Sequence, residues 1–308
     1  MASNIRLNRS VAVQERAVAA DGIETHDLAV NPLSVILLCL RPLAATTVPD
    51  SLAIYNALNR VSVLFRGESV FNMRGQDAAM LNYFRNGIVA PRPDFPAADN
   101  DRMCAVLPLL LGKFAYDPTS CFPASKRGEL VLELDIDVAD TGYDGFRYSV
   151  ETIEILGASP KEFERKVSQS VTLAATGDSD IDLPVGNLLR GALCFGTTSF
   201  FGEAAPAPSW GRMQVLLDNQ QHSVSSTDFE ALHASSCLLG RSPMLEQTGA
   251  SNAIITPPEV GNYGYLDFDP TRDDTFAIDT KGRSRCVVRT NAETADAVRV
   301  TSIERVSV

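Results

Sequence analysis

The stretch Ala19-Ala20-Asp21-Gly22, followed after four residues by Asp27-Leu28-Ala29-Val30, returns later as Ala174-Ala175-Thr176-Gly177 followed by Asp182-Leu183-Pro184-Val185. Six of these eight positions are identical, and each identical pair lies 155 residues apart (174 − 19). Self-similarity at a fixed spacing is the mark of a duplicated structural unit. The chain is therefore predicted to hold two copies of one domain in tandem.

The repeat continues toward the C-terminus, with changes of offset where the connecting segments differ in length. The further matches keep the same order in both halves, so we expect each half of the 308 residues to fold in the same way. The matched positions are Cys39 with Cys194, Arg60-Val61-Ser62-Val63-Leu64 with Arg212-Met213-Gln214-Val215-Leu216, Asp77 and Leu81 with Asp228 and Leu232, Leu134-Asp135-Ile136-Asp137 with Leu266-Asp267-Phe268-Asp269, and Val150, Ile153 and Glu154 with Val300, Ile303 and Glu304.

The composition is that of a globular protein, with 45% hydrophobic and 21% charged residues. A chain of 308 residues is long enough for two domains that each bury a core. The formal net charge of −11 argues against a general nucleic-acid-binding protein, because such proteins carry a basic binding face. The favoured explanation of this net charge is solubility.

The sequence predicts synthesis in the cytoplasm and no membrane-spanning segment. Ile5–Ser10 is not followed by the apolar segment of a secretory signal. The longest apolar run, Val35–Leu40, is much shorter than the roughly 20 residues that cross a bilayer.

Strand signals dominate the chain. In Leu130–Asp137, Leu132, Leu134 and Ile136 alternate with acidic residues, which indicates a strand with one face on a core and the other in water. Helices are expected only at residues 50–59, 76–84 and 226–233. The strands predicted in the first copy are 11–20, 33–43, 61–73, 103–114, 129–138 and 146–156.

Each copy is thus predicted to contain about eight strands, which is the strand number of a jelly roll. The fold class is all-β, with two tandem eight-stranded jelly-roll domains and short helices in their loops. Residues 1–10 are expected to form an N-terminal arm, residues 11–158 the first jelly roll and residues 159–308 the second. Tandem immunoglobulin-like domains are the alternative, but those domains run nearer to about 100 residues.

No pattern of residues indicates a catalytic, cofactor-binding or metal site. The six cysteines include no CxxC pair, and Cys39 and Cys194 lie in apolar runs, so we expect them in the core. The three histidines, His26, His222 and His233, form no HxH pair, which excludes the metal site of a cupin enzyme. Nucleophile-elbow and phosphate-loop motifs do not occur in the sequence.

Two acidic runs, Asp178–Asp182 and Asp267–Asp274, offer oxygen ligands that suit calcium. Neither has the spacing of a calcium loop that ends in glutamate. Ca²⁺ is therefore a weak candidate ligand, and the favoured interpretation is a solvated strand edge with Asp178 and Asp180 as turn residues.

The first twenty residues are basic, because they contain Arg6, Arg9 and Arg16 and only one acidic residue, Glu15. A basic arm suits contact with an anionic lipid surface or with nucleic acid. The alternative interpretation is a frayed leader that precedes the first strand.

Two similar tandem jelly rolls, a helix after the paired strands at 61–73 and again after 213–224, long loops and no catalytic constellation together resemble one known family. The chain is similar to the double jelly-roll major capsid proteins of tailless icosahedral phages, and the corticovirus-like, membrane-containing type is nearest in size. The resemblance covers nearly the whole chain and rests on architecture, so it transfers no site residue.

The resemblance implies a structural protein of the virion capsid, synthesised in the host cytoplasm and without enzymatic activity. It implies a homotrimer whose six jelly rolls form a pseudo-hexameric tile, with lattice contacts between trimers. Further implied partners are other capsid proteins such as a penton, and an inner membrane or the genome, reached through the N-terminal arm.

Two other functions remain open from the sequence. A tandem β-sandwich that binds carbohydrate or acts as an adhesin would usually expose aromatic side chains, and Trp210 is the only tryptophan of this chain. An enzyme on a duplicated β-sandwich would need a site that the sequence does not display.

Overall fold

The computed structural model describes residues 4–44, 53–88, 104–138, 143–174, 177–197, 209–222, 227–238, 246–248, 253–255, 261–292 and 295–308. Its contacts divide the chain into two compact units. Unit 1 comprises Met1–Asn82, Ala90–Val167 and Arg305–Val308, and unit 2 comprises Tyr83–Val89 and Ser168–Glu304. No helix in the described ranges is long and apolar enough to cross a membrane.

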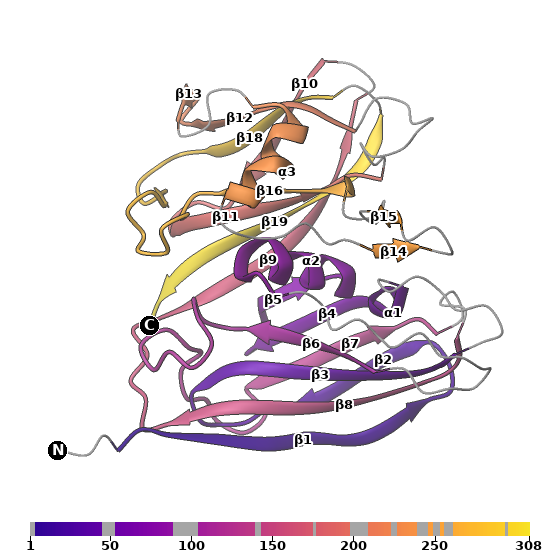
Figure 1. Ribbon diagram of the computed structural model, residues 1–308. Helices are drawn as coiled ribbons and strands as arrows, with labels where there is room; N and C mark the ends of the chain where they lie inside the picture. Colours follow the sequence, from indigo (N-terminus) through magenta and orange to yellow (C-terminus); the bar gives the residue numbers. More distant parts are fainter. Residues whose placement is uncertain are drawn as a thin grey trace. The chain divides into compact units, whose positions relative to one another are not determined.

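The eight strands of the first copy form two sheets, with strand orders β1-β8-β3-β6 and β5-β4-β7-β2 (Figure 1). The alternation that predicts β7 is seen directly, because its residues are buried and half-buried in turn. The strands are β1 (Arg6–Val18), β2 (Gly22–Asp27), β3 (Leu33–Ala44), β4 (Leu58–Phe65), β5 (Glu68–Met73), β6 (Ala105–Leu110), β7 (Leu130–Ile136) and β8 (Tyr143–Leu156), with helices α1 (Ala53–Asn56) and α2 (Gly75–Asn86).

The second copy has the strand orders β9-β19-β11-β16 and β10-β18-β12-β13, and the pairing of β9 with β5 joins the first of these orders to β5-β4-β7-β2 in one sheet. Its strands are β9 (Glu162–Leu173), β10 (Gly177–Leu183), β11 (Leu188–Phe195), β12 (Trp210–Leu217), β13 (Gln220–Gln221), β16 (Tyr263–Asp267), β18 (Cys286–Ala292) and β19 (Asp296–Ser307), with helix α3 (Phe229–Leu238). Three further short strands, β14 (Glu246–Thr248), β15 (Ala253–Ile255) and β17 (Ile278–Asp279), lie in its connections.

Strand order shows the duplication directly. When β14, β15 and β17 are set aside and the strands of each copy are numbered one to eight, both copies have the order 1-8-3-6 in one sheet and 2-7-4-5 in the other. Two four-stranded sheets of eight strands are a jelly roll. The predicted fold class, all-β with two tandem eight-stranded jelly rolls, is confirmed.

Repeat partners occupy the same strands of the two copies. Cys39 and Cys194 lie on the third strands, β3 and β11, and both are buried. One match is wrong, because Leu134–Asp137 begins in the seventh strand of its copy, whereas Leu266–Asp269 begins in the sixth. Any strand with one buried face can show alternating leucine and aspartate, so this pattern does not identify the strand.

Three local predictions also need correction. Residues 6–10 are not an arm, because β1 begins at Arg6 and pairs with β8 from that residue onward. Of the helix expected over 50–59, residues 50–52 lie outside the described residues, Ala53–Asn56 are helical, and β4 begins at Leu58. Strand β2 was missed because it is an exposed edge strand without an apolar face. The predicted boundary at 158/159 lies in the loop between β8 and β9.

Candidate functional site

The three histidines lie on different elements of the chain. His26 on β2 is partly buried, and its Nε2 lies 2.7 Å from the hydroxyl of Tyr148. Burial holds the pKa of His26 below its ordinary value, so the ring is neutral at neutral pH. His222 is exposed after β13, and His233 lies on α3. Within the described ranges, no group of three or more His, Cys, Asp or Glu residues could hold a metal ion.

Four of the cysteines are buried and are poor nucleophiles. Burial raises the pKa of the Cys194 thiol to about 12, and that of Cys121 and Cys286 to about 11. A thiol with such a pKa stays protonated and is a poor nucleophile. Cys39 is buried in the same way, whereas the thiol of Cys104 is exposed. The prediction that Cys39 and Cys194 belong to the core is confirmed.

The first acidic run lies on an edge strand and faces arginines. Asp180 accepts two hydrogen bonds from Arg289 on the neighbouring β18, at 2.6 and 3.0 Å. The hydrogen bond from Arg289 holds the pKa of Asp180 below its usual range. Asp182 accepts a hydrogen bond from Arg285 at 2.6 Å. The strand-edge interpretation is confirmed, but the expectation of turn residues is wrong, because Asp178 and Asp180 lie within β10.

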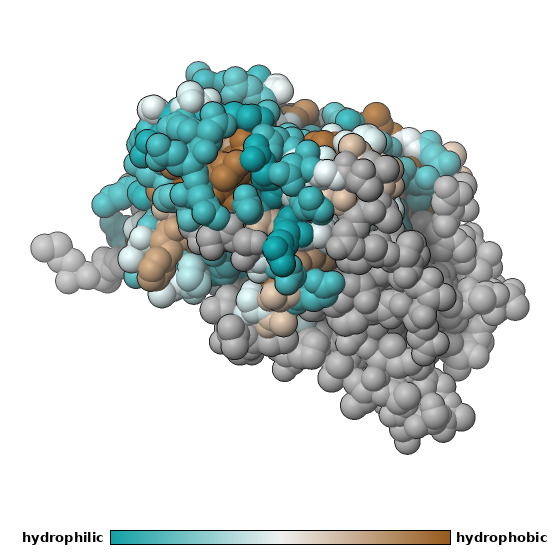
Figure 2. Space-filling view, turned by 90° about the horizontal axis from the view of Figure 1, so that it is seen from above, coloured by the Kyte–Doolittle hydropathy of each residue, from teal (hydrophilic) through white to brown (hydrophobic). Residues whose placement is uncertain are grey.

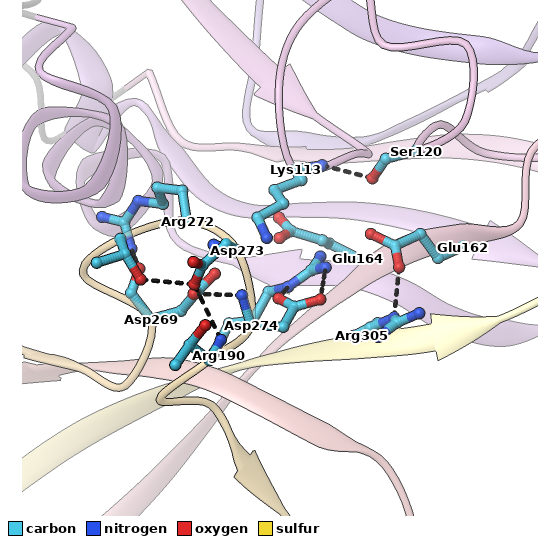
Figure 3. A network of polar contacts seen from close by, with 12 residues as sticks. Lys113, Ser120, Glu162, Glu164, Arg190, Asp269, Arg272, Asp273, Asp274 and Arg305 are labelled. Carbon is cyan, nitrogen blue, oxygen red and sulfur yellow. Dashed lines mark hydrogen bonds and ion pairs between the residues drawn. The ribbon is translucent and has the colours of Figure 1, made fainter.

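The second acidic run is a loop cross-linked by arginine (Figure 3). Arg272 donates to both oxygens of Asp267, at 2.7 and 2.8 Å. Asp269 accepts the backbone N–H groups of Asp273 and Asp274, at 3.1 and 2.8 Å. These carboxylates accept hydrogen bonds from arginine and backbone donors. The aspartates of the loop are therefore explained by contacts within the protein.

A buried arginine supports the same loop. The side chain of Arg190 on β11 has no exposed surface and binds both oxygens of Asp274, at 2.7 and 2.9 Å. Such a bidentate pair is the strong form of an ion pair. Arg190 was not predicted as a functional residue from the sequence. A cation inside the apolar run Leu188–Phe195 is the signal that could have indicated it.

Both copies also bury a glutamate at the same place on strand eight. Glu154 accepts hydrogen bonds from Ser10 at 2.7 Å and from Asn31 at 2.5 Å. Its repeat partner Glu304 accepts one from Asn187 at 2.8 Å. Asn187 lies immediately before strand three of its copy and Asn31 lies two residues before it, so an equivalent hydrogen bond links this turn to strand eight in both copies.

A polar pocket of about 650 Å³ opens in unit 2 beside β10, β12, β18 and the start of α3. Arg212 and Asp228 at its rim form an exposed ion pair at 3.3 Å. Trp210 lines the pocket but is only 1% exposed, and its ring stacks on Phe229 with a centroid distance of 6.2 Å. A buried indole offers no platform for a sugar ring.

Seen from above, the described surface is mostly hydrophilic, with small hydrophobic areas (Figure 2).

The basic residues near the N-terminus are largely paired. Arg9 lies 2.5 Å from Glu151, and Arg16 lies 2.8 Å from Glu24. Exposed pairs of this kind contribute about 0–1 kcal/mol, but they fix the direction of both side chains. The N-terminal segment is thus an edge strand with paired charges, and Arg6 is its first residue.

No family model and no curated protein sequence matches the chain. Solved structures do match over nearly its whole length. The crystal structure of the STIV MCP has a TM-score of 0.69 at 12% identity and covers 98% of this chain and 97% of that chain. The major capsid protein P2 from bacteriophage PM2 has a TM-score of 0.66 at 11% identity, with coverages of 98% and 97%. VP54 of PBCV-1 has a TM-score of 0.65 at 9% identity, with coverages of 99% and 94%.

At these identities the likeness establishes the fold. The chain has the double jelly-roll fold of major capsid proteins, as the sequence resemblance implied. The match covers both jelly rolls and nearly all of each neighbour, so it concerns the complete two-domain architecture.

Proposed function

We propose that the chain is a structural major capsid protein that associates with copies of itself to tile an icosahedral virion shell. The observation that carries the proposal is the identical strand order of the two copies, in an architecture shared end to end with solved major capsid proteins. The protein acts by assembly, without enzymatic chemistry.

Symmetry explains why a shell protein would be duplicated. A hexagonal lattice position needs six near-equivalent contacts around one axis. Three chains with two similar jelly rolls each supply six, while keeping the closed threefold symmetry of a homotrimer. The proposed particle is therefore a pseudo-hexameric trimer that makes lattice contacts with other trimers.

The proposed surroundings follow from that role. The chain is synthesised in the host cytoplasm, is located in the virion capsid, and meets other capsid proteins such as a penton at the fivefold positions. Contact with an inner membrane or the genome is proposed for the N-terminal end, through Arg6 and the residues before it. The pairing of Arg9 and Arg16 reduces the basic charge available there.

The alternative of a carbohydrate-binding or adhesin-like module is weaker. Its expected aromatic platform, Trp210, lies in the core of unit 2. The polar pocket beside it remains open to a ligand, but the surrounding charges are largely paired with one another.

Light scattering coupled to size exclusion tests the proposal. At micromolar concentration and near-neutral pH we expect a mass of three chains, with an interface above about 2,000 Å² as in obligate assemblies. Electron microscopy of the concentrated protein should show hexagonal outlines. A strict monomer under these conditions contradicts the proposed function.

A further inference from the structure

The first strand of the second copy pairs with the fifth strand of the first copy. Strand β9 runs parallel to β5, with Phe71 opposite Lys166 and Asn72 opposite Val167. All four residues belong to unit 1. Within this chain, strand five of one jelly roll therefore accepts strand one of the next.

The same two strand positions recur at the edges of sheets. Strand β1, the first strand of the first copy, is an edge strand and pairs with β8. Strand β13, the fifth strand of the second copy, is also an edge strand and pairs with β12. Among the described strands, one strand one and one strand five thus lie at the end of their strand orders.

The first strands of the two copies differ in burial. In β9, Glu164 and Lys166 are only 1% and 3% exposed. In β1, Val18 alone of the 13 residues is buried, and Leu7 and Val11 are 60% and 59% exposed. A long exposed edge strand with apolar side chains is a ready template for another strand, and folded proteins usually cover such an edge.

We propose that the pairing of β5 with β9 is repeated between chains, so that β1 of one chain lies parallel to β13 of its neighbour. This inference rests on the proposed homotrimer and names its strand-to-strand junction. The partner is a second copy of this chain because the internal junction is built from the equivalent two strands.

The repeat offsets define the register of the junction. On the accepting side, the offset of 151 that relates Asp77 to Asp228 leads from Phe71 to His222 (71 + 151). The strand pairing supports this equivalence. Phe71 lies opposite Val63, and the backbone N–H of His222 donates a hydrogen bond to the carbonyl of Val215, the repeat partner of Val63. His222 is exposed and directly follows β13.

On the entering side, the offset of 155 leads from Lys166 to Val11 (166 − 155). Two register shifts, between Val11 and Val13 and between Val13 and Arg16, move the equivalent position by up to two residues toward Arg9. The segment expected beside His222 of the neighbour is therefore Arg9–Val11.

Such a contact is head-to-tail, because it joins two different surfaces, and contacts of this type close into rings when the rotation allows. Three internal and three external junctions of one kind would then surround the axis of a trimer. Backbone hydrogen bonds supply the affinity in strand addition of this type, and the flanking side chains supply its specificity.

Cross-linking tests the junction. In a background with Cys104→Ser and Cys237→Ser, Val11→Cys and His222→Cys are combined in one chain and treated with a short bis-maleimide. We expect covalent dimers and trimers on a denaturing gel. The matched control combines His222→Cys with Ala17→Cys, an exposed position on the same strand about 20 Å from Val11. The control should yield at least tenfold less cross-linked product.

Light scattering of the same samples separates the two proposals. Trimers that do not cross-link above the level of the Ala17 control overturn the junction and leave the proposed assembly standing. A monomer overturns the proposed assembly and the junction together. Efficient cross-linking by Val11→Cys without His222→Cys would place β1 against β1 and also overturn the junction.

Discussion

The two jelly rolls have the same strand order but bury different kinds of side chain at the start of strand three. In the first copy this position is Val35, which is 3% exposed. In the second copy the repeat offset leads to Arg190 (35 + 155), which is fully buried. The arginine is accommodated because the loop between β16 and β18 supplies Asp274 as its partner. A duplicated architecture therefore tolerates a buried charge in one copy where a nearby loop provides the opposite charge.

By contrast, the two copies keep the same residues at positions that only pack in an apolar core. The third-strand cysteines, Cys39 and Cys194, are buried in both, and so are Ile153 and Ile303 on the eighth strands. Close-packed interiors resist changes of volume, which explains why these positions still match while surfaces and loops have diverged.

Removal of the buried arginine should have the largest effect. Arg190→Ala leaves the Asp274 carboxylate without its cation, and breaking a buried pair costs about 3–5 kcal/mol of unfolding free energy. Val35→Ala, at the equivalent position of the first copy, removes two methyl groups and should cost only about 2 kcal/mol. Urea denaturation measures both. An Arg190→Ala protein as stable as Val35→Ala would show that the ion pair is not the difference between the copies.

The asparagines before strand three should matter equally in the two copies. Asn31→Ala and Asn187→Ala each remove a donor to a buried glutamate, and hydrogen bonds to charged groups contribute about 1.5–3 kcal/mol. Asn59→Ala is the control, because its bond to Asp137 is exposed and long, at 3.3 Å. That change should stay within about 0.5 kcal/mol. Thermal unfolding of the three variants checks the ranking, and a loss confined to one copy would argue against a shared fastening.

Replacement of the core cysteines by serine should destabilise the two copies to different extents. Cys194→Ser buries a hydroxyl in an apolar cluster and should cost about 1–3 kcal/mol. Cys39→Ser should cost less, because the side chain of Ser149 lies within hydrogen-bonding reach of position 39. Chemical denaturation of both variants tests the order. Rapid reaction of Cys39 with a thiol reagent in the native protein would contradict its burial.

The smallest expected effect is a pH dependence specific to the first copy. Burial lowers the pKa of His26 from its ordinary 6.5, so the unfolded chain binds the proton more readily than the folded chain. The stability contributed by neutral His26 is therefore present above pH 6.5 and is lost as pH falls from there through the lower folded pKa. His26→Gln should flatten the dependence of Tm on pH between 7.5 and 5. An unchanged slope would assign that dependence to other groups.

The duplication and the fold class were predictable because repeats and alternation are properties of the sequence. The helices following strand five were predictable in the same way, and α2 and α3 lie where the patterns indicate. Strand β2 was not, because Gly22–Asp27 lies on a sheet edge where no apolar face is required. The start of β1 was missed for the same reason, since Arg6–Ser10 alternates no apolar residues against a core.

The polar interior could not be predicted either. The pairing of Arg190 with Asp274 joins residues 84 positions apart, and that of Glu154 with Ser10 joins residues 144 apart. The sequence shows the charges but not the loop geometry that brings them together. The acidic run Asp178–Asp182 illustrates this, because its calcium-like composition is explained by Arg289 on β18 and by Arg285 just before that strand, more than 100 residues away.

The exposed edge of β1 has a consequence for chains that have not yet assembled. A free chain presents an open strand on which another chain could add in the wrong register and begin a fibre. The register shifts after Val11 and Val13 interrupt a regular ladder, and the ion pairs of Arg9 and Arg16 place exposed charged side chains along the strand, which disfavours the addition of a second apolar strand. These features should slow misassociation more than correct docking, so that aggregation competes with shell formation only when chains accumulate faster than they find their proper neighbours.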